Sequence, residues 1–119
     1  PLAQHHYPWG NDFDADLSNC KETGIGHSNT VGAFSKAKSP YGAEEMSGNV
    51  WEWCQSQWKN YDYSPNDGRE RLDQYARRLL RGGSYYTSIM RVGCFVRFRS
   101  LPLDWGYHEG FRVFRPYYL

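Results

Sequence analysis

The three cysteines and four histidines are the side chains of this 119-residue chain that could bind a soft metal or act as nucleophiles. Cys20, Cys54 and Cys94 cannot all pair internally, and they form no Cys-x-x-Cys motif, so a structural zinc site or a dithiol redox site has little support. Cys94 lies among Phe and Val in a strand-like run. Because a reactive thiol requires an accessible, electropositive setting, we predict that Cys94 is buried and inert.

Aromatic side chains are the second chemically distinctive group, with 5 Trp, 10 Tyr and 6 Phe in a chain that is only 39% hydrophobic. Rings bury large areas, so we expect them to supply much of the core. Between residues 85 and 108 they alternate with Ser, Gly and Asp. This mixture gives rigid contact area and adaptable hydrogen bonding in antibody paratopes. The segment 85–108 is therefore a candidate binding surface.

The charge of the chain is close to balanced overall and uneven along its length. The net charge is +1, but residues 1–68 carry 4 Lys against 9 acidic side chains and residues 69–119 carry 10 Arg against 4. An arginine set without lysine is typical of pairing with carboxylates and stacking on rings. We therefore expect Arg91, Arg97 and Arg99 to be framework residues that pair with acidic side chains of the first half of the chain. Proteins that follow a phosphate backbone usually have clustered Lys and a larger positive excess, so no nucleic-acid partner is expected.

The element pattern predicts a single loop-rich α+β domain over residues 1–119, with a small antiparallel sheet and low helix content. The 12 Gly and 6 Pro are scattered as turn signals, and long helical periodicity is nearly absent. No apolar run approaches the roughly 20 residues that a membrane-spanning helix needs, so no transmembrane segment is expected. The start of the chain also lacks the basic and apolar pattern of a leader peptide.

Strands are expected at three places that position the candidate surface. Residues 49–53 and Leu79–Leu80 have strand-like apolar patterns, and Gly110 to Arg115 alternates until Pro116 ends the run. The polar stretch 59–76 is expected to be a surface excursion.

Five motifs occur in order along the chain: Tyr7-Pro8-Trp9-Gly10-Asn11, Ser39-Pro40-Tyr41-Gly42, Met46-Ser47-Gly48-Asn49-Val50-Trp51-Glu52-Trp53, Arg81-Gly82-Gly83-Ser84 and Gly110-Phe111-Arg112. Together they resemble the formylglycine-generating enzyme (sulfatase-modifying factor) domain, a variant of the C-type lectin fold. The resemblance covers Tyr7 to Phe114. Domains of this family usually begin well before the first motif, with a strand and helices. We therefore expect the chain to be a fragment, a compact version, or one part of a larger assembly.

The resemblance implies a calcium site in the third motif. The matching positions are the side chains of Glu45 and Glu52 and the carbonyls of Gly48 and Val50. Calcium takes about 6 to 8 oxygen ligands, so two carboxylates with carbonyls and waters are chemically adequate. The residues themselves leave a second interpretation open, in which Glu52 forms a salt bridge with one of the arginines.

The resemblance does not extend to the metal centres of the oxidative enzymes. Formylglycine-generating enzymes hold copper with two cysteine thiolates soon after the Gly-Gly-Ser turn, where this chain has Thr87 and only Cys94 nearby. Related iron-dependent sulfoxide synthases use a spaced set of histidines, which the adjacent His5 and His6 do not provide. Neither copper nor iron is expected, and His5, His6 and His27 are expected at the surface or in caps.

The segment between Ser84 and Gly110 is also similar to that of variable proteins diversified by retroelements, which use the same fold. Pro102 and Trp105 belong with the arginines to its framework, and the interleaved positions carry residue types that adenine changes in an Asn codon produce. The resemblance implies that ligand-binding residues are drawn from Tyr85, Tyr86, Ser88, Phe95, Val96, Phe98, Ser100, Leu101, Leu103, Asp104, Gly106, Tyr107 and His108.

Three functional interpretations follow. The leading one is a non-catalytic module that recognises a protein or other macromolecule through segment 85–108. The second is a metal-dependent oxidase similar to formylglycine-generating enzyme that uses Cys94, and the third is a structural subunit. Glu-Pro-Asn and Gln-Pro-Asp tripeptides are absent, so no calcium-bridged sugar site is expected. The oligomeric state and the compartment stay open.

A narrower form of the leading interpretation has fewer outward residues. In it, Phe95, Val96 and Phe98 pack inward. Strand alternation would also place Phe95 and Phe98 on opposite faces, so they could not all contact a ligand. Only Tyr85, Tyr86, Tyr107 and His108 would then face solvent.

Overall fold

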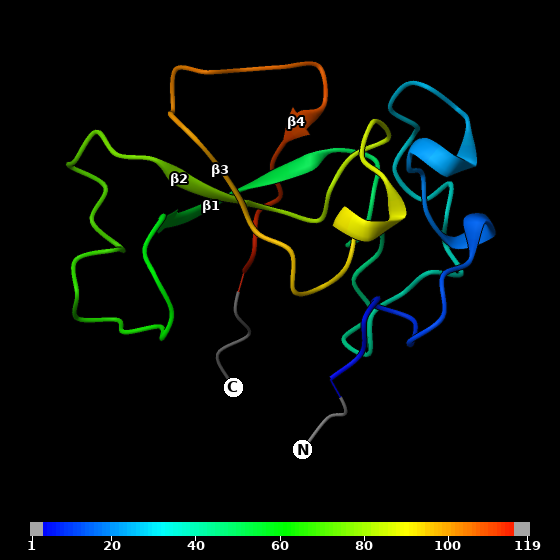
Figure 1. Cartoon of the computed structure of the whole chain (residues 1–119), viewed down its shortest axis with the longest axis horizontal. Coiled ribbons are helices and arrows are strands. Elements are labelled where there is room, and N and C mark those ends of the chain that lie inside the picture. Colours follow the sequence, from blue (N-terminus) through cyan, green and yellow to red (C-terminus); the bar gives the residue numbers. More distant parts are fainter. Residues whose placement is uncertain (1–3, 116–119) are drawn as a thin grey trace.

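The computed structural model describes residues 4–115 and contains one four-stranded sheet (Figure 1). The sheet has the order β3-β2-β1-β4 and is formed by β1 (Trp51–Gln57), β2 (Arg78–Arg81), β3 (Phe98–Ser100) and β4 (Glu109–Gly110). Helical structure in this part of the chain is limited to the 3-10 turns η1 (Ala15–Leu17), η2 (Lys21–Thr23) and η3 (Ile89–Arg91). The expectation of a loop-rich fold with little helix is confirmed.

The sheet is mixed, whereas the sequence predicted an antiparallel one. β1 pairs antiparallel with β2, and β2 with β3, but β4 runs parallel to β1 with Trp51 opposite Glu109. The cause is the path of the connection 101–108. It begins after Ser100, the last residue of the edge strand β3, and leads to Glu109 on the opposite edge, next to Trp51, the first residue of β1. A strand that begins beside the start of β1 can only run in the same direction. The segment 101–108 therefore spans the sheet.

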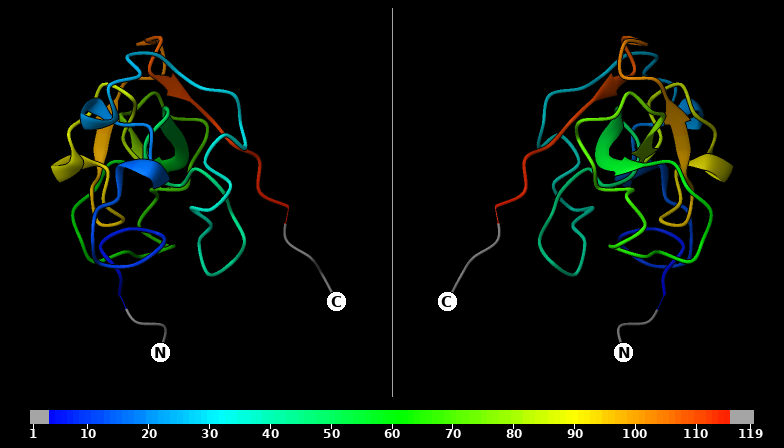
Figure 2. Two further views of the ribbon diagram at one scale, coloured as in Figure 1. Left: turned by 90° about the vertical axis from the view of Figure 1, so that its right-hand side faces the viewer. Right: turned by 90° about the vertical axis from the view of Figure 1, so that its left-hand side faces the viewer.

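Two strand boundaries differ from the predicted ones. β1 begins at Trp51 because Asn49 has a left-handed backbone with φ of 65° and lies in the preceding turn. β4 ends at Gly110, and residues 111–115 continue outside the sheet, so the long carboxy-terminal strand that the sequence predicted is wrong. Figure 2 shows this segment, in red, running away from the domain. Pro116 lies outside the described residues.

Polar contacts between loops, more than rings, hold the interior. Among residues 4–115, Trp51 is the one aromatic side chain in the buried core, so the expectation of an aromatic core is wrong. Most rings lie on loops beyond the small sheet, which has too little area to cover them. Ser18, Asn19 and Ser47 are instead buried around backbone bonds such as Asn49 N–H to the Asn19 carbonyl, 2.8 Å. The Ser18 and Ser47 hydroxyls donate to the carbonyls of Ser47 and Val92, whereas Asn19 Oδ1 has no partner among the described residues.

The expected surface excursion 59–76 is confirmed, and an internal ion pair organises it. The Arg69 side chain is 5% exposed and donates to both carboxylate oxygens of Asp67 and to the carbonyls of Asn60 and Asp62. These hydrogen bonds hold the pKa of Asp67 down at about 2, below its ordinary value.

This ion pair predicts a loss of stability in acid. A depressed carboxyl pKa means that Asp67 contributes stability above about pH 4 and that the contribution disappears as the pH falls toward 2. We expect the free energy of unfolding to fall more steeply between pH 5 and pH 2 in the natural chain than in Asp67→Asn, as measured by urea titration at each pH. Parallel curves for the two proteins would contradict the assignment.

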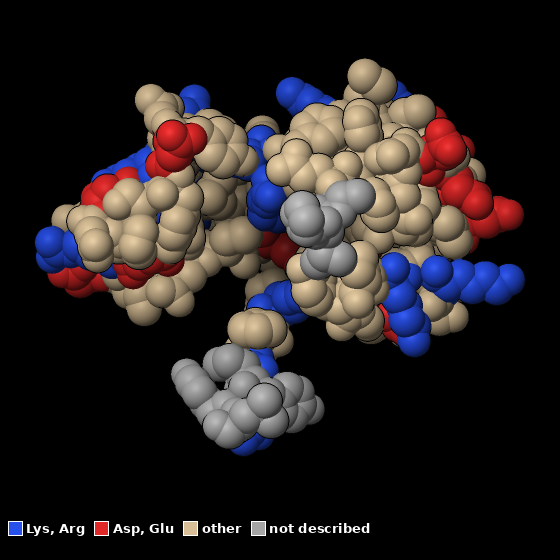
Figure 3. Space-filling view, turned by 90° about the horizontal axis from the view of Figure 1, so that it is seen from below, with Lys and Arg blue, Asp and Glu red and all other residues tan. Residues whose placement is uncertain are grey.

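Charges of both signs are mixed on the surface. Figure 3 shows the molecule from below, with blue and red side chains interspersed on its left-hand part and red ones grouped at its right-hand edge. Pairs such as Arg71 with Asp73, 2.6 Å apart, account for the mixing. None of the helices within residues 4–115 has the length and apolar character needed to cross a bilayer.

Candidate ligand-binding surface

A tight turn after β2 directs the first part of segment 85–108. Gly82 and Gly83 both have left-handed backbones, and a Cβ on Gly83 would lie 2.6 Å from Val92 Cγ1, so the chain passes directly over this buried side chain. The Tyr85 amide then donates to the Asn49 carbonyl at 2.9 Å. The turn is thereby attached to the third sequence motif.

The loop 101–108 is fixed by hydrogen bonds at both of its ends. The Asp104 carboxylate accepts from the Ser100 hydroxyl at 3.2 Å and from the Leu101 amide at 3.3 Å. At the other end, the Glu109 amide donates to the Gly106 carbonyl, and the Trp51 amide donates to the His108 carbonyl at 2.8 Å. The side chains of this loop are therefore presented on an ordered backbone.

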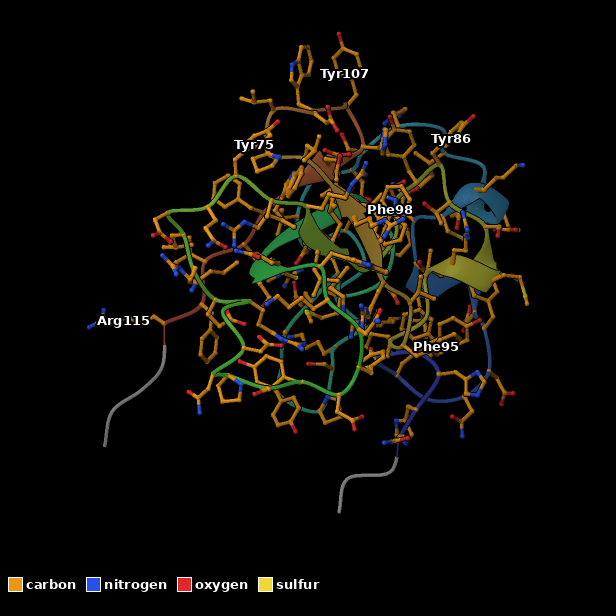
Figure 4. All side chains as sticks on the ribbon, turned by 60° about the vertical axis from the view of Figure 1, so that its left-hand side comes forward. Tyr75, Tyr86, Phe95, Phe98, Tyr107 and Arg115 are labelled. Atoms are coloured by element: carbon orange, nitrogen blue, oxygen red, sulfur yellow. The ribbon has the colours of Figure 1, made fainter. Side chains whose placement is uncertain are left out.

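Exposed rings gather where these two parts of the segment meet. We call the side chains of Tyr86, Leu103, Trp105, Tyr107 and His108 the upper aromatic surface. The rings of Tyr86 and His108 have centroids 6.5 Å apart, and those of Trp105 and Tyr107 are 6.2 Å apart. Tyr107 is 85% exposed and Trp105 81% exposed. Figure 4 shows Tyr107 and Tyr86 projecting from the same end of the molecule.

The other predicted rings lie elsewhere. Phe98 is 43% exposed and packs against Trp51, with centroids 5.4 Å apart. Phe95 is exposed at the opposite end from Tyr107 (Figure 4) and makes an edge contact with His6. Val96 is half-buried. The narrower interpretation is therefore wrong for Phe95 and Phe98, but these two rings do not join the upper aromatic surface.

The remaining predicted positions are buried or half-buried, apart from Asp104. Ser100 is buried beneath loop 101–108, and the half-buried positions are Tyr85, Ser88, Leu101 and Gly106. Asp104 is exposed, although its carboxylate is used within the loop.

Trp105 and Pro102 are exposed, and their expected role as framework is wrong. A usable signal was present in the sequence, because the run Leu-Pro-Leu-Asp-Trp-Gly has the Pro, Asp and Gly of a loop tip. A large apolar side chain at a loop tip lies outside the core.

In the described part of the chain, two of the framework arginines stack on rings instead of pairing with acidic side chains of the first half of the chain. The Arg97 guanidinium lies 4.3 Å from the Trp58 ring centroid and 4.2 Å from that of Tyr61, and it donates to the Lys59 carbonyl. Arg99 lies 5.0 Å from the Trp58 centroid. These contacts attach β3 to the excursion 59–76. Arg91 is exposed.

A largely buried carboxyl group lies at the base of the loop. The Glu109 side chain is 10% exposed, its Oε2 has no hydrogen-bond partner, and His108 Nε2 lies 4.0 Å from its Oε1. Burial raises the pKa of Glu109, while the neighbouring His108 lowers it.

The carboxylates predicted to bind calcium are engaged with other groups. Both oxygens of Glu52 accept from the Arg112 guanidinium, which also donates to the Glu45 carbonyl, and this bonding raises the pKa of Arg112. The Glu45 carboxylate accepts from the side-chain amides of Asn29 and Asn49. As arranged, these side chains do not fit calcium, because a guanidinium already neutralises Glu52. The salt bridge that the sequence left open is present.

This arrangement predicts insensitivity to calcium. We expect melting temperatures in millimolar CaCl2 and in excess EDTA to agree within about 1 °C, because a cation that does not bind the native state cannot stabilise it. Differential scanning fluorimetry would measure both values. A calcium-dependent rise of several degrees would mean that the ion displaces Arg112 and that the predicted site, with the carbonyls of Gly48 and Val50, forms on binding.

The cysteines are separated from one another. Cys94 is exposed, which contradicts the predicted burial, because residues 92–97 form turns outside the sheet instead of a strand. Partial burial of the thiol still raises the pKa of Cys94, although Arg81 opposes the shift. The pKa of Cys54 is raised for the same reason. Within residues 4–115 no three His, Cys, Asp or Glu side chains gather closely enough to hold a metal ion.

Comparisons with known proteins agree with the motifs. A family model described as "Sulfatase-modifying factor enzyme 1-like domain" matches residues 2–117. The chain is 31% identical over 116 residues to the serine/threonine-protein kinase pkn1 of Chlamydia caviae, covering 93% of this chain and 18% of the kinase. It is 29% identical over 132 residues to the formylglycine-generating enzyme of Thermomonospora curvata, covering 93% of this chain and 43% of the enzyme. The chain thus spans less than half of these relatives.

A solved structure shares the fold. Treponema denticola variable protein 1 superposes with a TM-score of 0.59 at 24% identity, over 81% of this chain and 34% of that one. The expected C-type lectin fold of the formylglycine-generating enzyme type is confirmed.

Proposed function

We propose, given that this chain belongs to the family of sulfatase-modifying factor enzyme 1-like domains, that it is a non-catalytic ligand-binding module. The upper aromatic surface binds the ligand, and the ligand is a protein. The relationship to Treponema denticola variable protein 1 shows a shared fold, so the argument depends on the surface itself.

One observation supports the proposal most directly: large apolar side chains project from an ordered loop. Leu103, Trp105 and Tyr107 are each more than three-quarters exposed, although hydrogen bonds fix both ends of their loop. Contiguous exposed apolar area on a soluble domain marks an interaction site. Rings on a fixed backbone lose little conformational entropy when they bind.

The shape of the surface favours a macromolecular ligand. Small molecules bind in concave sites that enclose most of their area, whereas these side chains project outward. Protein interfaces are enriched in Tyr and Trp, which supply most of their binding energy.

The experiment that tests this function has two stages. The purified chain, carrying a photo-crosslinker at Ser88 beside the surface, is used to identify a partner, and calorimetry with the purified partner then gives a dissociation constant. We expect saturable one-to-one binding that ring substitutions weaken, as set out in the Discussion. A dissociation constant that does not change when rings of the upper aromatic surface are substituted would contradict the proposal.

We further propose that segment 85–108 is diversified by a retroelement. The interleaved residue types that suggested this are the same ones that now contribute Tyr86, Leu103, Tyr107 and His108 to the surface. Sequencing the neighbouring DNA tests it: a near-copy of the codons for 85–112 with adenines at these positions, beside a reverse transcriptase gene, is the expected result. A unique coding segment with no such copy would contradict it.

A metal-dependent oxidase is the alternative function, favoured by the 29% identity to a formylglycine-generating enzyme. It would use Cys94, which is accessible. Within residues 4–115, however, no three His, Cys, Asp or Glu side chains gather closely enough to hold a metal ion, so Cys94 has no second thiolate to share copper with. Copper titration with an oxygen electrode separates the two functions. Stoichiometric copper binding with oxygen uptake that Cys94→Ser abolishes would establish the oxidase.

A further inference from the structure

A groove of about 390 Å³ opens beside the upper aromatic surface. Its lining includes Cys54, Gln55, Leu72, Tyr75, Arg78 and Pro102. The groove follows from the sheet register: Arg78 lies opposite Ser100 in the antiparallel pair, so the chain before β2 runs alongside the chain after β3. Figure 4 shows Tyr75 at the same end of the molecule as Tyr107.

The wall formed by residues 71–75 is held from inside. The buried Arg78 guanidinium donates to the carbonyls of Gln55, Arg71 and Gln74, at 2.7 to 3.1 Å. Leu72 and Tyr75 are nevertheless 71% and 64% exposed. Residues 71–75 therefore resemble loop 101–108, because both have exposed apolar side chains on a backbone that hydrogen bonds hold in place.

The lining selects an uncharged occupant. Leu72, Tyr75 and Pro102 form apolar walls. Two charged residues also line the groove, but Asp73 pairs with Arg71 and the Arg78 guanidinium donates to backbone carbonyls. The apolar walls therefore favour an apolar occupant.

Continuity with the upper aromatic surface identifies the source of the occupant. Pro102 forms one wall of the groove, and its neighbour Leu103 belongs to the upper aromatic surface. A protein that lies on Leu103 and Tyr107 therefore extends over the mouth of the groove.

We propose that the groove receives an apolar side chain of the protein ligand, so that Leu72 and Tyr75 belong to the binding surface. This inference rests on the proposed function. It extends the binding surface beyond segment 85–108 to Leu72 and Tyr75, which the sequence placed only in a surface excursion.

Cys54 provides a direct test, because this residue is part of the lining of the groove. In a Cys94→Ser variant, Cys54 is converted to a mixed disulfide by thiol–disulfide exchange with one of two symmetrical disulfides. One is the disulfide of N-phenylacetyl cysteamine, and the other is the disulfide of N-hydroxyacetyl cysteamine. Mass spectrometry measures the 2-mercaptoethanol concentration at which half of each mixed disulfide is reduced. Peptide mapping confirms that the modified residue is Cys54. We expect reduction of the phenyl compound to need a 2-mercaptoethanol concentration about tenfold higher than reduction of the hydroxyacetyl compound, since the phenyl ring is withdrawn from water in the groove.

Matched variants locate the effect. Leu72→Ser should reduce the difference between the two compounds to less than about twofold, while Leu103→Ser, an equivalent change on the upper aromatic surface, should preserve it. Equal retention of both compounds in the Cys94→Ser protein would overturn the proposal. Tryptophan fluorescence confirms that each variant is folded.

Binding of the partner separates this inference from the proposed function. We expect Tyr75→Ser to weaken partner binding about tenfold. If Tyr75→Ser and Leu72→Ser leave the dissociation constant unchanged while Tyr107→Ala weakens it, the groove is not a ligand subsite and the proposed function stands. If all three leave it unchanged, both fail.

Discussion

Gly48→Ala is expected to destabilise the domain by about 4 kcal/mol, which is most of the free energy of unfolding of a marginally stable domain. Gly48 has φ of +85°, and a Cβ there would lie 2.4 Å from the Asn19 carbonyl oxygen and 2.6 Å from Ser18 Oγ. Left-handed backbone accounts for about 1 to 2 kcal/mol of this, and forced displacement of a buried backbone group supplies the rest. Urea titration followed by tryptophan fluorescence would measure the loss.

Gly24→Ala is the matched control. Gly24 has nearly the same φ, +80°, but nothing lies within 4 Å of its Cβ position. We expect it to show only the backbone contribution, about 1 to 2 kcal/mol. Similar losses for the two variants would mean that the Asn19 loop moves aside freely and does not brace the third motif.

Gly48→Ala is also expected to weaken ligand binding at the upper aromatic surface. The Gly48 amide donates to the Gly82 carbonyl, and the adjacent Asn49 carbonyl accepts from Tyr85. Displacing this loop would therefore release the turn that directs segment 85–108. Partner binding should be lost together with stability.

Tyr107→Ala is expected to weaken partner binding by about 30-fold or more without unfolding the domain. Truncation of a central interface ring typically costs about 2 kcal/mol or more. Tyr107 is 85% exposed, so its removal leaves no cavity in the core. Calorimetric titration of the purified partner measures the change, and Trp105→Ala should have a comparable effect because the two rings are in contact.

Tyr41→Ala provides the comparison for Tyr107→Ala. Tyr41 is 81% exposed, which makes the two substitutions alike in size and accessibility, but it lies in the second motif, outside the upper aromatic surface. We expect a change in affinity of less than about twofold. Should Tyr41→Ala weaken binding as much as Tyr107→Ala, the ligand contacts a different face.

The candidate site could be predicted from the sequence only in part. Segment 85–108 was predicted from its residue types, and within it the Tyr86 and His108 rings lie close together, as do those of Trp105 and Tyr107. Phe95 could not be separated from them, because its position at the opposite end depends on the turn over Val92. Tyr75 could not be included, since only the register of β2 and β3 brings it alongside.

Local sequence signals are enough to identify the family, the loop-rich fold and the tight turn after β2. These depend on local chemistry: the pair Gly82-Gly83 permits the left-handed backbone that a tight turn requires, and short apolar runs favour the first strands.

The tertiary structure alone decided the direction of β4, the pairing of Glu52 with Arg112 across 60 residues, and which rings share one surface. Each of these is a contact between distant parts of the chain. The residue types permit several such contacts, and only the packing of the whole domain selects one of them.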